Sequence, residues 1–437
     1  MKKGYLFLFL SGILMSALAA GCNGSDTKGN GGVSLAAAPR LSPIGGQAAI
    51  GVSGGNPGDL PPNTDQDELK ALMIAAAAGG SSAIFLKEGT DGADDGVARL
   101  LDGLQNGGIS FYKQGNNGGL IARDDVVLIK INSQWAERGG TNTDVLKGII
   151  QYIVSHPDGF TGEVIIADNG QSMFGSTRTG GNLDWDNTNA KDRTQSAQDV
   201  ADYFDARGYH VSGVLWDKMT RTRVNEFEAG DAKDGFVVEA GEHATGLVVS
   251  YAKFTTKYGA RVSFKRGIWN GTRYDSNKLK VINAPVLKSH GQYQVTGAMK
   301  SYMGTPSNSL TNMSPHNSVG RGGMGTQMVM TRFPVITILD MVWITPDGGP
   351  GSSYSRAVAK NMIAASTDPV ALDYWASKNV LIPAAQASGN RRYSSMNPDS
   401  TEPGSFGYWL RLSMAELEKG GFPATMDESK MRVIRVN

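Results

Sequence analysis

Cysteine is almost absent from this sequence, since Cys22 is the only one among 437 residues. A lone thiol cannot form an intramolecular disulfide, and the residues that follow it offer no thiolate for a zinc or iron–sulfur site. The sequence therefore excludes a cysteine-ligated iron–sulfur cluster and leaves the identity of any other cofactor open.

An excess of charge of one sign is also lacking, because 42 lysines and arginines balance 41 aspartates and glutamates to a formal net charge of +1. Nucleic-acid binding depends on clustered basic side chains, so nucleic acid is not an expected partner. The 5 histidines have neither the HExxH spacing nor the paired spacing of zinc enzymes. The glycine-rich segment 139–142 does not match the GxGxxG or GxxxxGKS loops of nucleotide sites.

The apolar stretch at the amino end, residues 5–18, is too short for a comfortable membrane span. It follows Lys2 and Lys3 and ends in small residues, which is the pattern of a signal peptide. We therefore predict a signal peptide over residues 1–21 and export of the chain.

The signal ends in LAAGC, which resembles a bacterial lipoprotein signal with Cys22 as the lipidated residue. It departs from that pattern at Ala19, where leucine is more usual. We predict a lipid anchor at Cys22 in a bacterial membrane of the cell envelope, since several acyl chains would bind the membrane firmly. Ordinary cleavage, giving a soluble periplasmic or secreted protein, is the alternative.

Residues 22–64 are rich in glycine, serine, asparagine and proline, and we interpret them as a flexible tether. Residues 65–437 then form an α/β domain in which apolar strands alternate with helical patterns. The apolar run 126–131 is typical of a strand that is buried on both faces of a parallel sheet. We predict a three-layer fold with a mainly parallel sheet flanked by helices and an inserted subregion near 219–271. The predicted strands are 83–87, 126–131, 164–167, 211–216, 247–251, 260–264, 281–287 and 334–339, and the predicted helices are 65–78, 96–104, 144–154, 197–207, 357–364, 369–380 and 408–418.

The segment 280–304, KVINAPVLKSHGQYQVTGAMKSYMG, holds several charged and polar side chains near one predicted strand end. Lys288 and His290 follow the strand, and an amphipathic helix is predicted after them, with Thr296 and Lys300 four residues apart on one face. The polar, glycine-rich stretch 305–326 that comes next is predicted to be flexible and to cover a site, with His316 as a further candidate.

This segment resembles the most distinctive motif of the family DUF362, a domain of unknown function. The segments DDVVLIKIN, VIIADNG, VITILDMVWITPDGGPG and STDPVALDYWA extend the resemblance over about residues 83–381. Some relatives carry ferredoxin-like iron–sulfur modules, which would imply redox-linked work in those members. Because this chain lacks the cysteines, it resembles at most a redox-associated partner without its own cluster.

Several predicted strands end in charged or polar side chains. In a parallel sheet these ends share one edge, where ligands bind, so we expect the side chains to converge. The residues concerned are Lys130, Asn132, Asp168, Lys288, His290 and Asp340.

We assign candidate roles from the chemistry of each residue type. His290, Lys288 and Asp168 are the catalytic candidates, because they can exchange a proton near neutral pH or orient a group that does. Candidate ligands for an anionic substrate are Lys130, Asn132, Thr141, Asn142, Thr296 and Lys300, where Thr141 and Asn142 precede a helix. Asp168 and Asp340 are candidate ligands for a divalent cation, although each could instead hold a helix amino end.

These residues favour an exported, membrane-anchored protein that binds a small anionic molecule and acts on it with acid–base or divalent-metal help. A non-catalytic ligand-binding or surface-assembly lipoprotein is the alternative. The sequence names neither the substrate nor the reaction, and it does not identify a protein partner.

Overall fold

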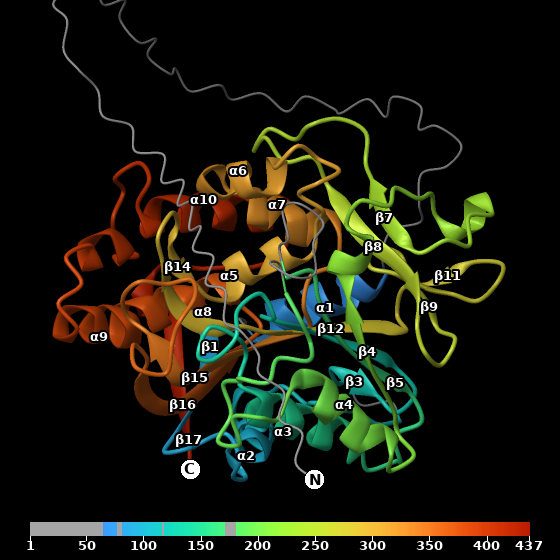
Figure 1. Cartoon of the computed structure of the whole chain (residues 1–437), viewed down its shortest axis with the longest axis horizontal. Helices are drawn as coiled ribbons and strands as arrows, with labels where there is room; N and C mark the ends of the chain where they lie inside the picture. Colours follow the sequence, from blue (N-terminus) through green and yellow to red (C-terminus); the bar gives the residue numbers. More distant parts are fainter. Residues whose placement is uncertain (1–63, 77–80, 116–117, 171–180) are drawn as a thin grey trace, which may run out of the picture. The chain divides into compact units, whose positions relative to one another are not determined.

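The apolar runs predicted to be strands form the centre of a ten-stranded sheet (Figure 1). A computed structural model describes residues 64–76, 81–115, 118–170 and 181–437. Along the sheet the strand order is β17-β1-β16-β15-β12-β4-β5-β6, and β13 and β14 extend it beside β15. The strands are β1 Ser82–Glu88, β4 Val126–Ile131, β5 Glu163–Asp168, β6 His210–Leu215, β12 Leu279–Ala284, β13 Val286–His290, β14 Gln294–Thr296, β15 Ile336–Thr345, β16 Val358–Ser366 and β17 Met431–Val436.

Five of these strands run parallel, as predicted: β15, β12, β4, β5 and β6. Strands β5 and β12 are buried along their whole length, because helices cover both faces of the sheet. Because these five strands run parallel, their carboxyl ends lie at one edge of the sheet. The candidate site lies at that edge.

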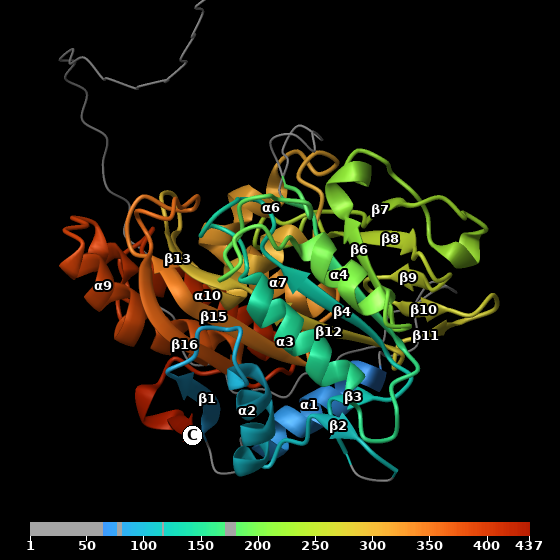
Figure 2. The same ribbon diagram turned by 60° about the horizontal axis from the view of Figure 1, so that its bottom comes forward.

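The helices form two groups, one on each face of the sheet (Figure 2). In one group α3 contacts both α2 and α4, and in the other α5 and α10 each contact both α7 and α8. Helix α3 buries Val145, Ile149, Ile150 and Ile153, the stripe its sequence pattern indicates. The helices are α1 Thr64–Ala76, α2 Gly96–Asp102, α3 Thr143–Val154, α4 Ala197–Asp205, α5 Ala298–Ser301, α6 Ser314–Ser318, α7 Gly323–Met330, α8 Pro369–Ala376, α9 Ile382–Ala387 and α10 Phe406–Lys419.

The predicted subregion near 219–271 is a second, antiparallel sheet of five strands in the order β11-β10-β9-β8-β7. Its strands are β7 Gly235–Val238, β8 Ser250–Thr255, β9 Arg261–Ser263, β10 Gly267–Trp269 and β11 Tyr274–Asp275, and a separate pair joins β2 Tyr112–Lys113 to β3 Ile121–Ala122. None of the helices in the described part of the chain has the length and apolar character that a membrane span requires. The predicted signal peptide, Cys22 and the tether lie outside the described residues and stay predictions.

The prediction of a helix at 357–364 is wrong, because these residues form β16 between β15 and β1. Alanine and methionine favour a helix locally, but pairing with two neighbouring strands outweighs that preference. The exposure of β16 alternates along its first half and then gives way to full burial, as expected where a strand enters the sheet.

The prediction that the strand ends at residue 287 and a helix follows is also wrong. Lys288 and His290 belong to β13, which turns at Gly291 and pairs with β14 in an antiparallel hairpin. Thr296 therefore lies on β14, while Lys300 lies on the short helix α5, so they do not share a helix face. Pro285 separates β12 from β13 and allows β13 to continue along β15.

Residues 305–326, predicted to be flexible, are instead largely buried and contain α6 and the start of α7. The buried hydroxyl of Ser307 donates to Thr220 O at 2.5 Å, which joins this segment to the region after β6. Asp340 does not end its strand, since β15 continues for five residues beyond it.

Candidate functional site

One face of the β13–β14 hairpin carries four polar residues, three of them predicted site residues and the fourth Gln294. Lys288 lies opposite Thr296, and His290 lies opposite Gln294. Directly opposed residues share a face, and residues two apart on a strand do so as well. The hairpin thus carries two levels of side chains, about 7 Å apart at about 3.4 Å per residue.

Lys130 and Asp168 form a buried ion pair at the carboxyl ends of β4 and β5. The Lys130 ammonium lies 2.8 Å from Asp168 Oδ1, and the exposed fractions of the two side chains are 0% and 3%. Lys130 also donates to Ile131 O at 2.5 Å and to Ser301 Oγ at 3.2 Å. Burial lowers the pKa of Lys130, and the Asp168 carboxylate opposes that shift. Asp168 is therefore the counterion of Lys130.

Asp168 is held in place by its second oxygen. Asp168 Oδ2 accepts from Ser133 N at 2.7 Å and from Ser133 Oγ at 3.1 Å. Gly304 closes over the pair, because a Cβ at this position would lie 2.1 Å from Asp168 Oδ1 and 2.3 Å from Lys130 Cε. The chain after α5 can pack on the ion pair only with glycine there.

Lys288 and Lys300 are buried beside this pair, each 3% exposed. Lys288 donates to the carbonyl of Gly139. The Lys300 ammonium lies 5.7 Å from the ring centroid of Tyr293, and within the described ranges it makes no hydrogen bond or ion pair. Burial and then the Lys300 ammonium lower the pKa of Lys288 to about 7. Burial and then the Lys130 ammonium lower the pKa of Lys300 to about 7.

Two histidines adjoin the lysines. His290 Nδ1 accepts from Gln292 N at 3.1 Å and from Tyr293 N at 3.4 Å, which places the proton of the neutral ring on Nε2. Burial and then the Lys300 and Lys288 ammonium groups hold the pKa of His290 far below its ordinary value. Burial and then Lys300 lower the pKa of His316 to about 4. His290 is thus neutral at pH 7 and offers an N–H donor.

Three predicted anion ligands instead bind the protein itself. Thr141 Oγ1 donates to Ala284 O at 2.7 Å and accepts from Asn132 N at 2.8 Å. Asn132 Oδ1 accepts from Val286 N at 3.0 Å. Asn142 caps α3 by accepting from Asp144 N at 2.9 Å. These contacts fix the strand ends around the lysines.

Asp340 contacts the predicted residue Asn142 but lies three strands away from Asp168. Its carboxylate accepts from Asn142 N at 2.9 Å and Val342 N at 3.0 Å, and burial raises its pKa to about 7. Strand β15 is three intervals from β5, about 14 Å at the usual strand spacing. Asp168 and Asp340 therefore cannot ligate one cation, and no three histidine, cysteine, aspartate or glutamate side chains gather into a metal site in the described part of the chain.

No role was predicted from the sequence for Arg391 and Arg392. They line a pocket of about 310 Å³ together with His290. Two adjacent arginines after Gly389 and Asn390 could have indicated an anion-binding segment. Nothing in the sequence, however, linked them to His290, about a hundred residues away.

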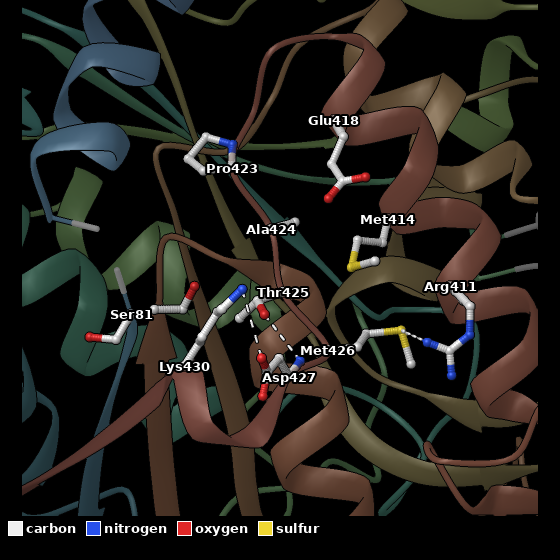
Figure 3. A pocket seen from close by; sticks show the side chains of 11 residues that line it. Ser81, Arg411, Met414, Glu418, Pro423, Ala424, Thr425, Met426, Asp427 and Lys430 are labelled. Atoms are coloured by element: carbon white, nitrogen blue, oxygen red, sulfur yellow. Dashed lines mark hydrogen bonds and ion pairs between the residues drawn. The ribbon is translucent and has the colours of Figure 1, made fainter. Parts of the chain in front are cut away.

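A second pocket, of about 490 Å³, lies near the carboxyl end of the chain (Figure 3). It adjoins Ser82, the first residue of β1, and so lies at the amino edge of the sheet, away from the lysines. Its charged side chains have both signs, with Lys430 3.7 Å from Asp427 and Arg411 directed at the sulfur of Met426. None of the predicted site residues within the described ranges lines it.

Residues 276–378 match the family model described as Domain of unknown function (DUF362). The match contains the hairpin, α5 and β15, together with the motif from which the resemblance was predicted. No curated protein and no solved structure matches the chain.

Proposed function

We propose that this member of the DUF362 family binds a small anionic molecule at Lys288, Lys300 and His290. The observation that carries the proposal is the charge balance of the site. Three lysines are buried there, and a single carboxylate, that of Asp168, is paired with one of them.

Burying an ammonium group without a counterion is costly, and the cost is relieved either by losing the proton or by gaining an anion. The lowered pKa values of Lys288 and Lys300 reflect the tendency to lose the proton. A bound phosphate or carboxylate would instead supply the missing counterion. It would also accept from His290 Nε2–H and from the buried hydroxyl of Thr296, whose Oγ1 has no hydrogen-bond partner within the described ranges.

We extend the proposal to acid–base chemistry on the bound molecule. A lysine with a pKa of about 7 exists in both protonation states at neutral pH, which suits it to accept and return a proton. A metabolite screen for turnover by the purified protein would separate this activity from simple binding. No step of the proposal requires a divalent cation.

The binding test is calorimetry with inorganic phosphate. Lys300→Met should weaken phosphate binding by about tenfold or more, because it removes a charge-assisted contact. Lys253→Met is the matched control. Lys253 is also buried, but it lies on β8 of the second sheet and donates to Asp231 O at 2.6 Å. Equal affinities in the two variants, or no phosphate binding by the unmodified protein, would refute the proposal.

We also propose that the chain is exported and anchored in the cell envelope through acylation of Cys22, on the strength of the predicted signal alone. In cells fed a labelled fatty acid, the protein should carry the label, and Cys22→Ser should lose it. A labelled Cys22→Ser protein, or an unlabelled and soluble parent, would refute the anchor.

A further inference from the structure

The pocket beside His290 is lined by basic and neutral side chains. Arg391 and Arg392 are exposed at its rim, His290 and Gln294 come from the hairpin, and Asn390 and Ser394 complete the wall. Among the residues that the structure describes, no aspartate or glutamate lines this pocket. Arg392 donates to Gly291 O at 3.2 Å, which ties the arginine segment to the hairpin turn. The pocket therefore attracts anions from solvent.

The hairpin connects this pocket to the buried lysines. His290 and Gln294 form the outer level of the hairpin face, and they line the pocket. Lys288 and Thr296 form the inner level, about 7 Å along the strands. His290 is close enough to Lys300 and Lys288 for their charges to lower its pKa, after the effect of burial. One face of a single hairpin thus runs from an arginine pocket to a lysine cluster.

We infer that the site takes a molecule with two acidic groups, one held by Lys288 and Lys300 and the other by Arg391 and Arg392. This inference rests on the proposed anion binding and adds the substrate class, a dicarboxylate or a phosphorylated carboxylic acid. His290, at the outer level, would donate Nε2–H between the two acidic ends. The volume of about 310 Å³ leaves room for the outer half of such a molecule.

The two ends have different physical roles. The inner acid replaces the missing counterion of buried ammonium groups. The outer acid meets exposed arginines, which hold carboxylates through paired N–H groups. Joining both acids in one molecule makes the second contact intramolecular, so the affinity should exceed that of either acid alone.

The test is a series of probes of increasing length measured by calorimetry: acetate, malonate, succinate, glutarate, adipate and pimelate. We expect dicarboxylates long enough to span the two levels to bind about tenfold or more tightly than acetate. In Arg391→Gln/Arg392→Gln that advantage should disappear. The matched control is Arg261→Gln/Arg432→Gln, two exposed arginines on β9 and β17, which should keep it.

The outcomes separate this inference from the proposed function. If acetate and every dicarboxylate bind equally, or if the advantage survives in Arg391→Gln/Arg392→Gln, the second acidic group has no site there and the inference fails. In that case phosphate binding that is lost in Lys300→Met would still support the proposed function. If neither inorganic phosphate nor any of these acids binds the unmodified protein, both fail together.

Discussion

The Lys130 ammonium lies 2.8 Å from Asp168 Oδ1 in a region closed to solvent. The two charges come from neighbouring strands, and Gly304 packs its backbone against both. This pair compensates one of the three lysines buried at the site, Lys130, Lys288 and Lys300. The uncompensated charge on Lys288 and Lys300 underlies the proposed function.

Asp168→Asn should destabilise the protein by roughly 3–5 kcal/mol, because it leaves the buried Lys130 ammonium without a counterion. Urea denaturation measures the change. The control is Asp205→Asn, which breaks the exposed pair with Lys257 and should cost far less. Similar losses in the two variants would show that the Lys130–Asp168 pair is not a buried charge pair.

Gly304→Ala should cost roughly 1–3 kcal/mol through overpacking, since the added Cβ would meet Asp168 Oδ1 and Lys130 Cε. Gly118→Ala, at a position with open space around the added Cβ, is the control. Thermal unfolding compares them. Unchanged stability in Gly304→Ala would mean that the chain after α5 does not press on the ion pair.

Stability should rise with pH between about 7 and 10 through the two unpaired lysines. The folded-state pKa of Lys300 is about 7, below the unfolded value of about 10.4, so the unfolded chain binds more protons in this window. The stability that Lys300 contributes is therefore lost as pH falls from about 10 to 7. Lys300→Met should flatten the profile by up to about 1.4 kcal/mol per pH unit, as measured by denaturation at a series of pH values. An identical slope in the variant and its parent would contradict the lowered pKa.

Much of the sheet could be predicted because its central strands are continuous apolar runs. Residues 126–131 are an apolar run typical of a strand buried on both faces of a parallel sheet, and this strand was predicted with its bounds. Residues 358–366 have no such run, and their strand exists because β1 and β15 flank it. Contacts of that kind leave no local signal.

The site was predictable in part for the same reason. Lys130, Asp168 and Lys288 come together because the carboxyl ends of parallel strands share one edge of the sheet. This rule can be applied to a sequence alone. Asp340 was placed wrongly at a strand end, since the continuation of β15 depends on its pairing with β16. Arg391 was missed because only the tertiary fold brings its segment to the hairpin turn.

Anion binding should take up protons at pH 8. At that pH the amines of Lys288 and Lys300 are mostly neutral, and a bound anion favours their charged forms. Calorimetry of phosphate binding in buffers of different ionisation enthalpy should report net proton uptake, and affinity should fall as pH rises above 7. Proton release, or binding independent of buffer, would contradict this coupling.

The most direct test of the central claim is a crystal structure of the protein grown with inorganic phosphate. We predict a phosphate within hydrogen-bond distance of the Lys300 and Lys288 ammonium groups and of His290 Nε2. Clear density for these three side chains with no anion between them, at a phosphate concentration that saturates calorimetric binding, would contradict the account.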